Sequence, residues 1–192
     1  MDRYIGCGPA SILPYLPETI GEYTGVDMNP AYIEYAEKRW KDRRHCRFFC
    51  RRVEDIEILQ KGYYDIVLAI GVLHHLDDEE AILLFDIASQ VLKLGGTLIT
   101  YDNVNVANQH WFARWLISKD RGKAVRTVEG YKRLGAPYFP EMEGEVLNDT
   151  LRIPYTILVM KCTKRNSAVR QVISHPLSLQ KSGKHDSSSS IK

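Results

Sequence analysis

Strand-like and helix-like segments alternate along the first hundred residues of this 192-residue chain. The clearest strand is the run from Tyr64 to Ile70 (YDIVLAI), whose almost continuous apolar character is typical of a strand covered on both faces. Alternation of this kind predicts an α/β protein with a mostly parallel sheet and helices on both of its faces. The other strands are expected at residues 2–5, 22–26, 47–53, 97–101, 143–148 and 155–162.

Helix signals lie between these strands. Asn29 and Pro30 supply an N-cap and a first helical residue, and Tyr32, Ile33, Ala36 and Trp40 then follow on one helical face. A second helix is expected from Glu79 to Val91, with Ile82, Leu83, Ile87 and Val91 facing inward, and Leu94-Gly95-Gly96 should end it in a turn. Shorter helices are expected at 10–16, 107–117 and 127–134.

The length favours one domain. We expect it to span residues 1–165 and to be followed by a disordered, basic and serine-rich tail at 166–192. The segment from Lys164 to the end holds six Lys or Arg and one Asp, so residues 1–163 carry a small net negative charge. A dedicated nucleic-acid binder would show a basic face in its folded part. We therefore expect a small-molecule partner and no nucleic acid.

Four cysteines, at positions 7, 46, 50 and 162, are scattered along the chain without zinc spacing, which predicts reduced thiols and no metal site. The chain shows no signal peptide and no apolar run of about 18 residues, so we expect a cytoplasmic protein without a membrane span. The sequence leaves the oligomeric state open.

The loop Gly6-Cys7-Gly8 directly follows the first and shortest predicted strand. Glycine at both positions lets the backbone press against a ligand or adopt a positive φ. The free N–H groups of a following helix would suit a polar or anionic ligand group. Short Gly-x-Gly loops also form ordinary tight turns, so the loop alone does not distinguish a binding site from a turn.

Other loops expected at the carboxyl edge of the sheet strengthen the binding interpretation. Asp27 ends the second strand, 19 residues after Gly8, where a carboxylate can accept both ribose hydroxyls of a nucleoside cofactor. Asp55 ends the third strand and could accept the amine of adenine while Ile56 covers the ring. The alternatives are a solvated strand-end Asp27 and a polar turn at Glu54-Asp55.

Taken together, these segments resemble the class I S-adenosylmethionine-dependent methyltransferases, in particular the small-molecule type with an HHL segment. The resemblance covers residues 4–102 well and 103–163 loosely. It rests on five segments in the family's order: Ile5–Ala10 (IGCGPA), Asp27, Glu54-Asp55, Tyr64–Leu76 with His74-His75-Leu76, and Val91–Leu98 (VLKLGGTL).

The resemblance implies a Rossmann-like, doubly wound, seven-stranded sheet with its last strand antiparallel. It implies methyl transfer from S-adenosylmethionine to a small-molecule or lipid-like acceptor. The cofactor-binding residues that it implies are Gly6, Cys7, Gly8, Asp27, Met28, Glu54, Asp55, Ile56, Gly71 and Val72.

Two departures from the family pattern concern the start of the chain. Tyr4 stands where the family usually has an acid that orients the charged amino-acid end of the cofactor. We also expect the family's N-terminal helix to be missing before this motif. One alternative is therefore a truncated, catalytically weak or inactive methyltransferase-like domain. An NAD-dependent oxidoreductase is disfavoured, because Ser11 occupies the place of the third glycine in the dinucleotide fingerprint.

The catalytic residues remain open at this stage. His75 is the candidate general base, because imidazole changes its protonation near neutral pH. The alternative for both His74 and His75 is a structural role, in which the ring packs against the sheet. Asn103 is a candidate contact to the acceptor. Trp111, Phe112 and Trp115 could pack on the sheet or line an apolar acceptor pocket.

Overall fold

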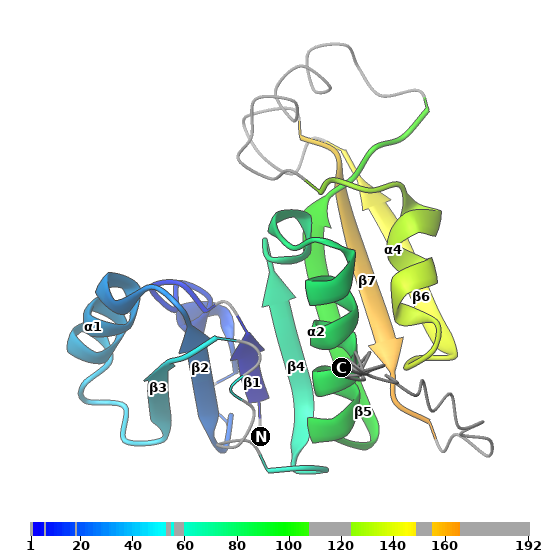
Figure 1. Cartoon of the computed structure of the whole chain (residues 1–192). Coiled ribbons are helices and arrows are strands. Elements are labelled where there is room, and N and C mark those ends of the chain that lie inside the picture. Colours follow the sequence, from blue (N-terminus) through cyan, green and yellow to red (C-terminus); the bar gives the residue numbers. More distant parts are fainter. Residues whose placement is uncertain are drawn as a thin grey trace, which may run out of the picture.

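The structure is a computed structural model that describes residues 2–5 (by their backbone), 7–17, 19–52, 55, 60–107, 124–148 and 155–165. Seven strands form one sheet in the order β3-β2-β1-β4-β5-β7-β6 (Figure 1). The strands are β1 (Asp2–Ile5), β2 (Tyr23–Asp27), β3 (Cys46–Cys50), β4 (Tyr64–Ile70), β5 (Leu92–Asn103), β6 (Glu141–Leu147) and β7 (Ile157–Thr163).

Strands β1 to β5 pair with one another in parallel, and β7 runs antiparallel to both β5 and β6. The predicted α/β sheet with an antiparallel last strand is therefore confirmed. β1 has only four residues, yet it pairs with β2 on one side and with β4 on the other. The chain reverses direction across the sheet at this point, which is where open α/β sheets hold their ligands.

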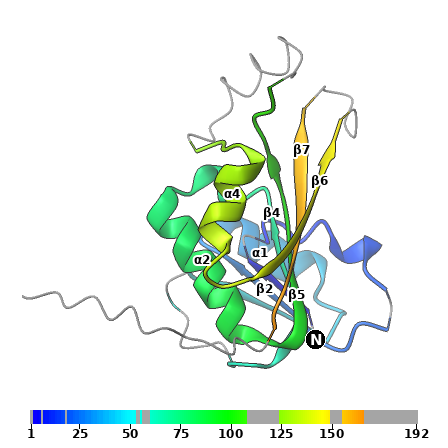
Figure 2. The ribbon, with the colours of Figure 1, turned by 90° about the vertical axis from the view of Figure 1, so that its right-hand side faces the viewer.

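Three α-helices lie among the described residues: α1 (Pro30–Arg39), α2 (Asp78–Val91) and α4 (Val128–Gly135). The Asn29 side chain caps α1 by accepting from the Ala31 N–H at 3.0 Å, as the sequence predicts. Asp77 and Glu80 form a capping box at the start of α2, each accepting from the backbone N–H of the other. In Figure 2, α2 and α4 cover the same face of the sheet.

The strand β4 shows how the sheet separates two apolar clusters. Val67 and Ala69 belong to a cluster with α2, α4 and β7, whereas Leu68 belongs to a second cluster with η1 (a 3₁₀ turn, Leu13–Tyr15) and α1. Successive side chains of a strand point to opposite faces, so the continuous apolar run of β4 serves both clusters. This explains why that strand is the clearest one in the sequence.

Three local predictions are wrong. The segment 10–16 forms only η1, since Ala10 has a positive φ of 54° and Pro14 limits a helix. The predicted turn at Leu94-Gly95-Gly96 is part of β5, which begins at Leu92 directly after α2; Gly95 has a φ of 79°, and the pairing with β4 shifts register there. Third, the side chain of Ile82 is expected to face inward from the second helix, but it is 38% exposed.

One of the remaining predicted segments is confirmed, and two lie almost entirely outside the described residues. The helix predicted at 127–134 is confirmed as α4, with Thr127 as its N-cap. The helix predicted at 107–117, with its three aromatic residues, and the tail at 166–192 lie outside the described residues except for Ala107. Within the part of the chain that the structure covers, no helix is both long and apolar enough to cross a membrane.

We predict that Gly25→Ala destabilises the fold. A Cβ at Gly25 would lie 2.8 Å from Cδ1 of Phe48 and 2.9 Å from Sγ of Cys7, both in the core beneath the first loop. Overpacking of this kind costs about 1–3 kcal/mol, and thermal unfolding should show a lower Tm. Gly21→Ala is the matched control, because a Cβ there meets nothing within 4 Å. Equal Tm values for the two variants would contradict the packing described here.

Candidate functional site

The carboxylate of Asp27 organises the first loop. One carboxylate oxygen accepts from the Gly8 N–H at 2.8 Å, and the other accepts from the Asn29 N–H at 2.8 Å. Gly8 has a φ of 50°, and a Cβ there would point into open space. Asp27 therefore joins the end of β2, the loop after β1 and the start of α1, and it keeps lone pairs free for a ligand.

Cys7 packs beneath this loop. Its side chain is buried, and its thiol lies 3.4 Å from the Gly8 carbonyl oxygen, to which it donates. Burial, with a further contribution from the nearby Asp27 charge, raises the pKa of the Cys7 thiol to about 12. The thiol is protonated at neutral pH, so it is not a nucleophile. Cys7 is not among the cavity-lining residues, and its predicted role in cofactor binding stays a prediction.

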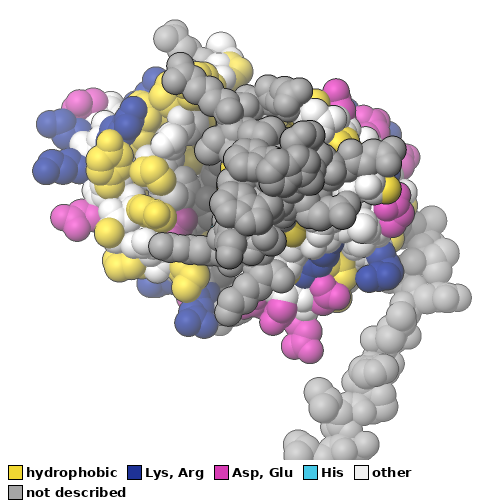
Figure 3. All heavy atoms as spheres, turned by 90° about the horizontal axis from the view of Figure 1, so that it is seen from above, with side chains coloured by type: hydrophobic (Ala, Val, Ile, Leu, Met, Phe, Trp, Pro, Cys, Tyr) yellow, Lys and Arg dark blue, Asp and Glu magenta, His cyan; other side chains and the backbone are white. Residues whose placement is uncertain are grey.

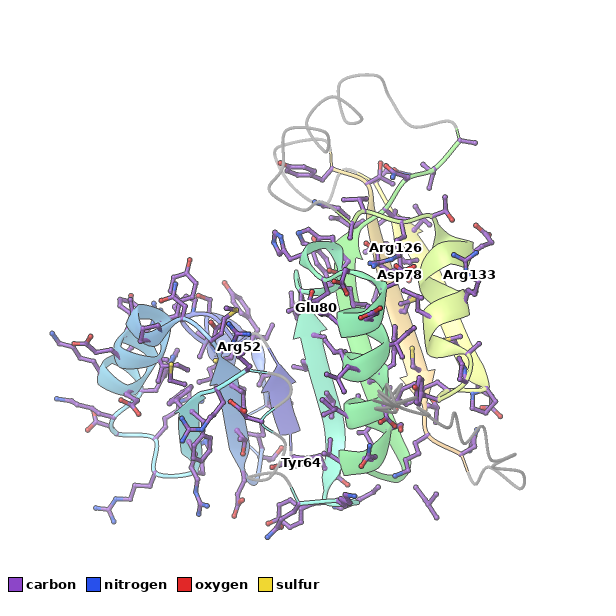
Figure 4. All side chains as sticks on the ribbon, in the orientation of Figure 1. Arg52, Tyr64, Asp78, Glu80, Arg126 and Arg133 are labelled. Atoms are coloured by element: carbon purple, nitrogen blue, oxygen red, sulfur yellow. The ribbon has the colours of Figure 1, made fainter. Side chains whose placement is uncertain are left out.

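A cavity of about 540 Å³ opens beside Asp27, at the carboxyl ends of β2 and β4. Figure 4 shows two of its charged residues: Arg52, which lies near the carboxyl ends of β2 and β3, and Glu80, which lies at the start of α2. Its walls also contain several of the predicted cofactor-binding residues. The cavity is lined by Gly8, Val26, Asp27, Met28, Tyr32, Arg51, Arg52, Gly71, Val72, His75, Leu76, Glu80 and Leu83.

The two histidines after β4 have different surroundings. His75 is exposed and lines the cavity. His74 is buried behind it, with Nδ1 at 2.8 Å from a carboxylate oxygen of Asp102, which also accepts from the His74 backbone N–H at 3.2 Å. The two imidazole rings are in contact, with centroids 4.0 Å apart. Sequence reasoning missed this pairing, because Asp102 lies 28 residues away on β5.

The carboxyl group of Asp102 is buried, and within the described part of the chain only its Oδ1 has hydrogen-bond partners, which are the ring and the backbone N–H of His74. Its second oxygen, Oδ2, is buried without a hydrogen-bond partner among the described atoms. Burial raises the pKa of the Asp102 carboxyl, and the hydrogen bond with His74 acts against that rise. The pair His74–Asp102 is therefore a place where the fold can hold a proton next to the cavity wall.

Arg126 holds the histidine turn in place, and no feature of the sequence pointed to it. Its Nε donates to the Asp78 carboxylate at 2.8 Å, and its Nη2 lies 2.7 Å from the same oxygen in an ion pair. Its other donors reach the carbonyl oxygens of Leu73, Leu76 and Ala124 at 2.9–3.0 Å. Four guanidinium N–H groups thus donate hydrogen bonds, and the turn that carries His74 and His75 is fixed to α2 and to the start of α4 (Figure 4).

Not every predicted residue comes together at the cavity. Asp55 is exposed, its carboxylate lies 3.4 Å from the Arg52 N–H, and it is not among the cavity-lining residues. Asn103 is buried and likewise does not line the cavity; its carbonyl oxygen accepts from the Tyr131 hydroxyl at 3.0 Å. Gly6, Glu54 and Ile56 lie outside the described residues. The proposed roles of these five residues stay predictions.

Comparison with protein families gives a match to a methyltransferase domain over residues 4–100. A segment of the highly reducing polyketide synthase 2 of Gibberella zeae is 34% identical over 90 residues, which is 44% of this chain. A segment of the hybrid PKS-NRPS synthetase mpsA of Macrophomina phaseolina is 31% identical over 123 residues, or 58% of this chain. The matched segment is 3% of the length of either synthase.

Solved structures share the fold at low sequence identity. The YcgJ protein of Bacillus subtilis matches with a TM-score of 0.67 and 12% identity, over 85% of this chain and 91% of that one. The geranyl diphosphate C-methyltransferase of Streptomyces coelicolor A3(2), determined with Mg²⁺, geranyl diphosphate and S-adenosyl-L-homocysteine, matches with a TM-score of 0.66 and 13% identity, over 85% of this chain and 70% of that one.

Asp102→Asn should change how stability depends on pH. The folded protein binds the Asp102 proton more tightly than the unfolded chain does, so this group lowers the free energy of unfolding as pH rises from about 3.8 through its raised pKa. Asparagine cannot ionise and still offers an oxygen to His74. Urea unfolding at several pH values measures this dependence. Across this pH window, the free energy of unfolding of the variant should rise relative to that of the wild type by about 1.4 kcal/mol per unit of pKa shift. A constant difference would refute the assignment.

Proposed function

Because this chain belongs to the methyltransferase domain family, we propose that it transfers a methyl group from S-adenosylmethionine to a small-molecule or lipid-like acceptor. The cavity beside Asp27 is the proposed cofactor site. The observation that carries the proposal is the Asp27 carboxylate, which is fixed by two backbone N–H groups at the cavity rim.

The residues present fit the adenosyl part of such a cofactor. Each oxygen of Asp27 uses one lone pair on a backbone N–H and keeps another for a ribose hydroxyl. The open space at Gly8 lets the ligand approach the backbone, and Val26, Met28 and Val72 offer apolar walls to a base. A volume of about 540 Å³ falls within the range of small-molecule and cofactor pockets.

When bound, the cofactor supplies a methyl group on a positively charged sulfur atom. The protein's task is then to orient the acceptor and to exclude water. An acceptor that must lose a proton needs a base within reach. His75 is our candidate, because it lines the cavity, while His74 and Asp102 brace its ring from behind.

The names of related proteins and the cavity lining support the proposed acceptor class. One structural neighbour is a methyltransferase whose name specifies geranyl diphosphate, and the matched relatives are polyketide synthases or hybrid synthetases. Both kinds of name specify small-molecule chemistry. The apolar residues of the cavity, which include Leu76 and Leu83 on the side of α2, are compatible with a carbon-rich acceptor.

Calorimetric titration with S-adenosylmethionine, S-adenosylhomocysteine and NAD tests the proposal. We expect both sulfur compounds to bind and NAD to give no heat. Asp27→Ala should weaken binding of S-adenosylhomocysteine at least tenfold, about 1.4 kcal/mol, because ribose hydroxyls lose their acceptor. Asp27→Asn tests the same point while keeping the side-chain shape, and Glu79→Ala is the control, since Glu79 is exposed and does not line the cavity.

The outcomes separate the alternatives. Binding of NAD would overturn the proposed cofactor in favour of a nicotinamide-dependent enzyme. A folded wild-type protein that binds none of the three compounds would support an inactive methyltransferase-like domain. Unchanged affinity in both Asp27 variants would remove Asp27 from the site.

A further inference from the structure

A strongly basic segment forms one edge of the molecule, and the proposed function leaves most of it unused. Residues 38–52 contain eight Lys or Arg and one Asp. They comprise the end of α1, the turn that follows it, the edge strand β3 and the two arginines after β3. We call residues 38–52 the basic edge. In Figure 3, Lys and Arg side chains project from the end of the molecule that carries α1 and β3 in Figure 1.

Within the part of the chain that the structure describes, no ion pair neutralises the positive charge of the basic edge. Among the described residues, the ion pairs involve His74, Lys93, Arg126, Lys161 and Arg165, and none involves a cation of residues 38–52. Seven of its eight cations are exposed, and Arg43 is half-buried. The other residues of the 1–163 segment carry an excess of Asp and Glu, so the field of the molecule directs polyanions to this edge.

Two of these cations, Arg39 and Arg43, are held in place by contacts with aromatic side chains. The guanidinium carbons of Arg39 and Arg43 each lie 5.2 Å from the centroid of the Trp40 ring, and Arg39 also donates to the Tyr35 hydroxyl at 3.2 Å. A groove of about 380 Å³ runs over this region, with Lys41, Arg43, Arg44 and Arg47 among its lining residues and Glu37 as its one acid. Arginines fixed in this way lose less entropy when they bind an anion.

The character of the surface favours phosphate groups over an acidic protein. Protein interfaces are built around exposed apolar anchors. The large hydrophobic side chains exposed in the described structure all lie outside residues 38–52. Two of the three aromatic rings of the edge are packed, Trp40 by two guanidinium groups and Phe48 by Tyr23 at 5.9 Å, and Phe49 is half-buried. The edge therefore offers many cations and no exposed large apolar side chain.

We propose that the basic edge binds the phosphate backbone of nucleic acid, without reading its sequence. A nucleic-acid binder is expected to carry a basic face in its folded part, and residues 38–52 form such a face. The net charge of residues 1–163 does not reveal it, because Asp and Glu residues elsewhere in that segment balance the local excess of Lys and Arg. The competing explanation is that charges on β3 merely protect an exposed sheet edge from pairing with another chain. Arg51 and Arg52 also line the proposed cofactor cavity, whereas Lys41, Arg44 and Arg47 do not.

The test is fluorescence anisotropy with a fluorescein-labelled 20-nucleotide uridine RNA at several salt concentrations, using the full chain. We expect binding with a dissociation constant on the order of 10⁻⁴–10⁻⁶ M that weakens steeply with salt. The triple variant Lys41→Gln, Arg44→Gln, Arg47→Gln should bind at least tenfold more weakly at low salt. Its slope of log K against log salt should be about two units less negative, since each lost phosphate contact on a single strand contributes about 0.7.

The matched control is Lys61→Gln, Arg133→Gln, Lys161→Gln, which removes the same charge from exposed positions elsewhere; Figure 4 shows Arg133 on α4, at the opposite end of the sheet. Its affinity should stay within twofold of the wild type, and all three proteins should have similar Tm values. Absence of binding, equal weakening in both triple variants, or wild-type affinity in the first would each overturn the proposal. The last result would point to the basic C-terminal segment. Equal competition by poly-L-glutamate would assign the edge to an acidic protein instead.

Discussion

The bridge made by Asp27 is the interaction on which the candidate site depends. A single carboxylate fixes the Gly8 N–H and the Asn29 N–H at 2.8 Å each, and so holds the loop after β1 and the start of α1 at the end of β2. The short β1 has too few residues to impose that geometry alone, although it pairs on both sides. Charge-assisted hydrogen bonds to backbone N–H groups are stronger than neutral ones, which suits this anchoring role.

The opposite wall of the cavity has an anchor of its own. Arg126 pairs with Asp78 and donates to three backbone carbonyl oxygens, and it thereby fixes the turn between β4 and α2. His75 and Val72 line the cavity from that turn, with the buried pair His74–Asp102 behind them. The cavity thus lies between two walls that are each fixed by one charged side chain, and a ligand placed between them meets a preorganised surface.

Sequence reasoning found the parts of this arrangement that have a local signature. The apolar run of β4, the Asn29-Pro30 helix start and Asp27 at a strand end all follow from residue type and position. Arg126, Glu80 and Leu83 were missed, because their place at the site comes from packing between distant segments. The turn predicted at Leu94-Gly96 failed for a different reason: Gly95 takes its positive φ within β5 without ending the strand. The basic edge was missed because net charge averages over the chain.

A titration of ¹⁵N-labelled protein with S-adenosylhomocysteine, followed by two-dimensional NMR, tests at the level of single residues whether the cavity between Asp27 and Val72 is an adenosyl-cofactor site. The largest changes in amide chemical shift should fall on Gly8, Asn29, Gly71 and Val72, with little change at Lys132 and Arg133 on α4. Saturating ligand that leaves these four amides unchanged, or that shifts amides only elsewhere on the fold, would contradict this assignment.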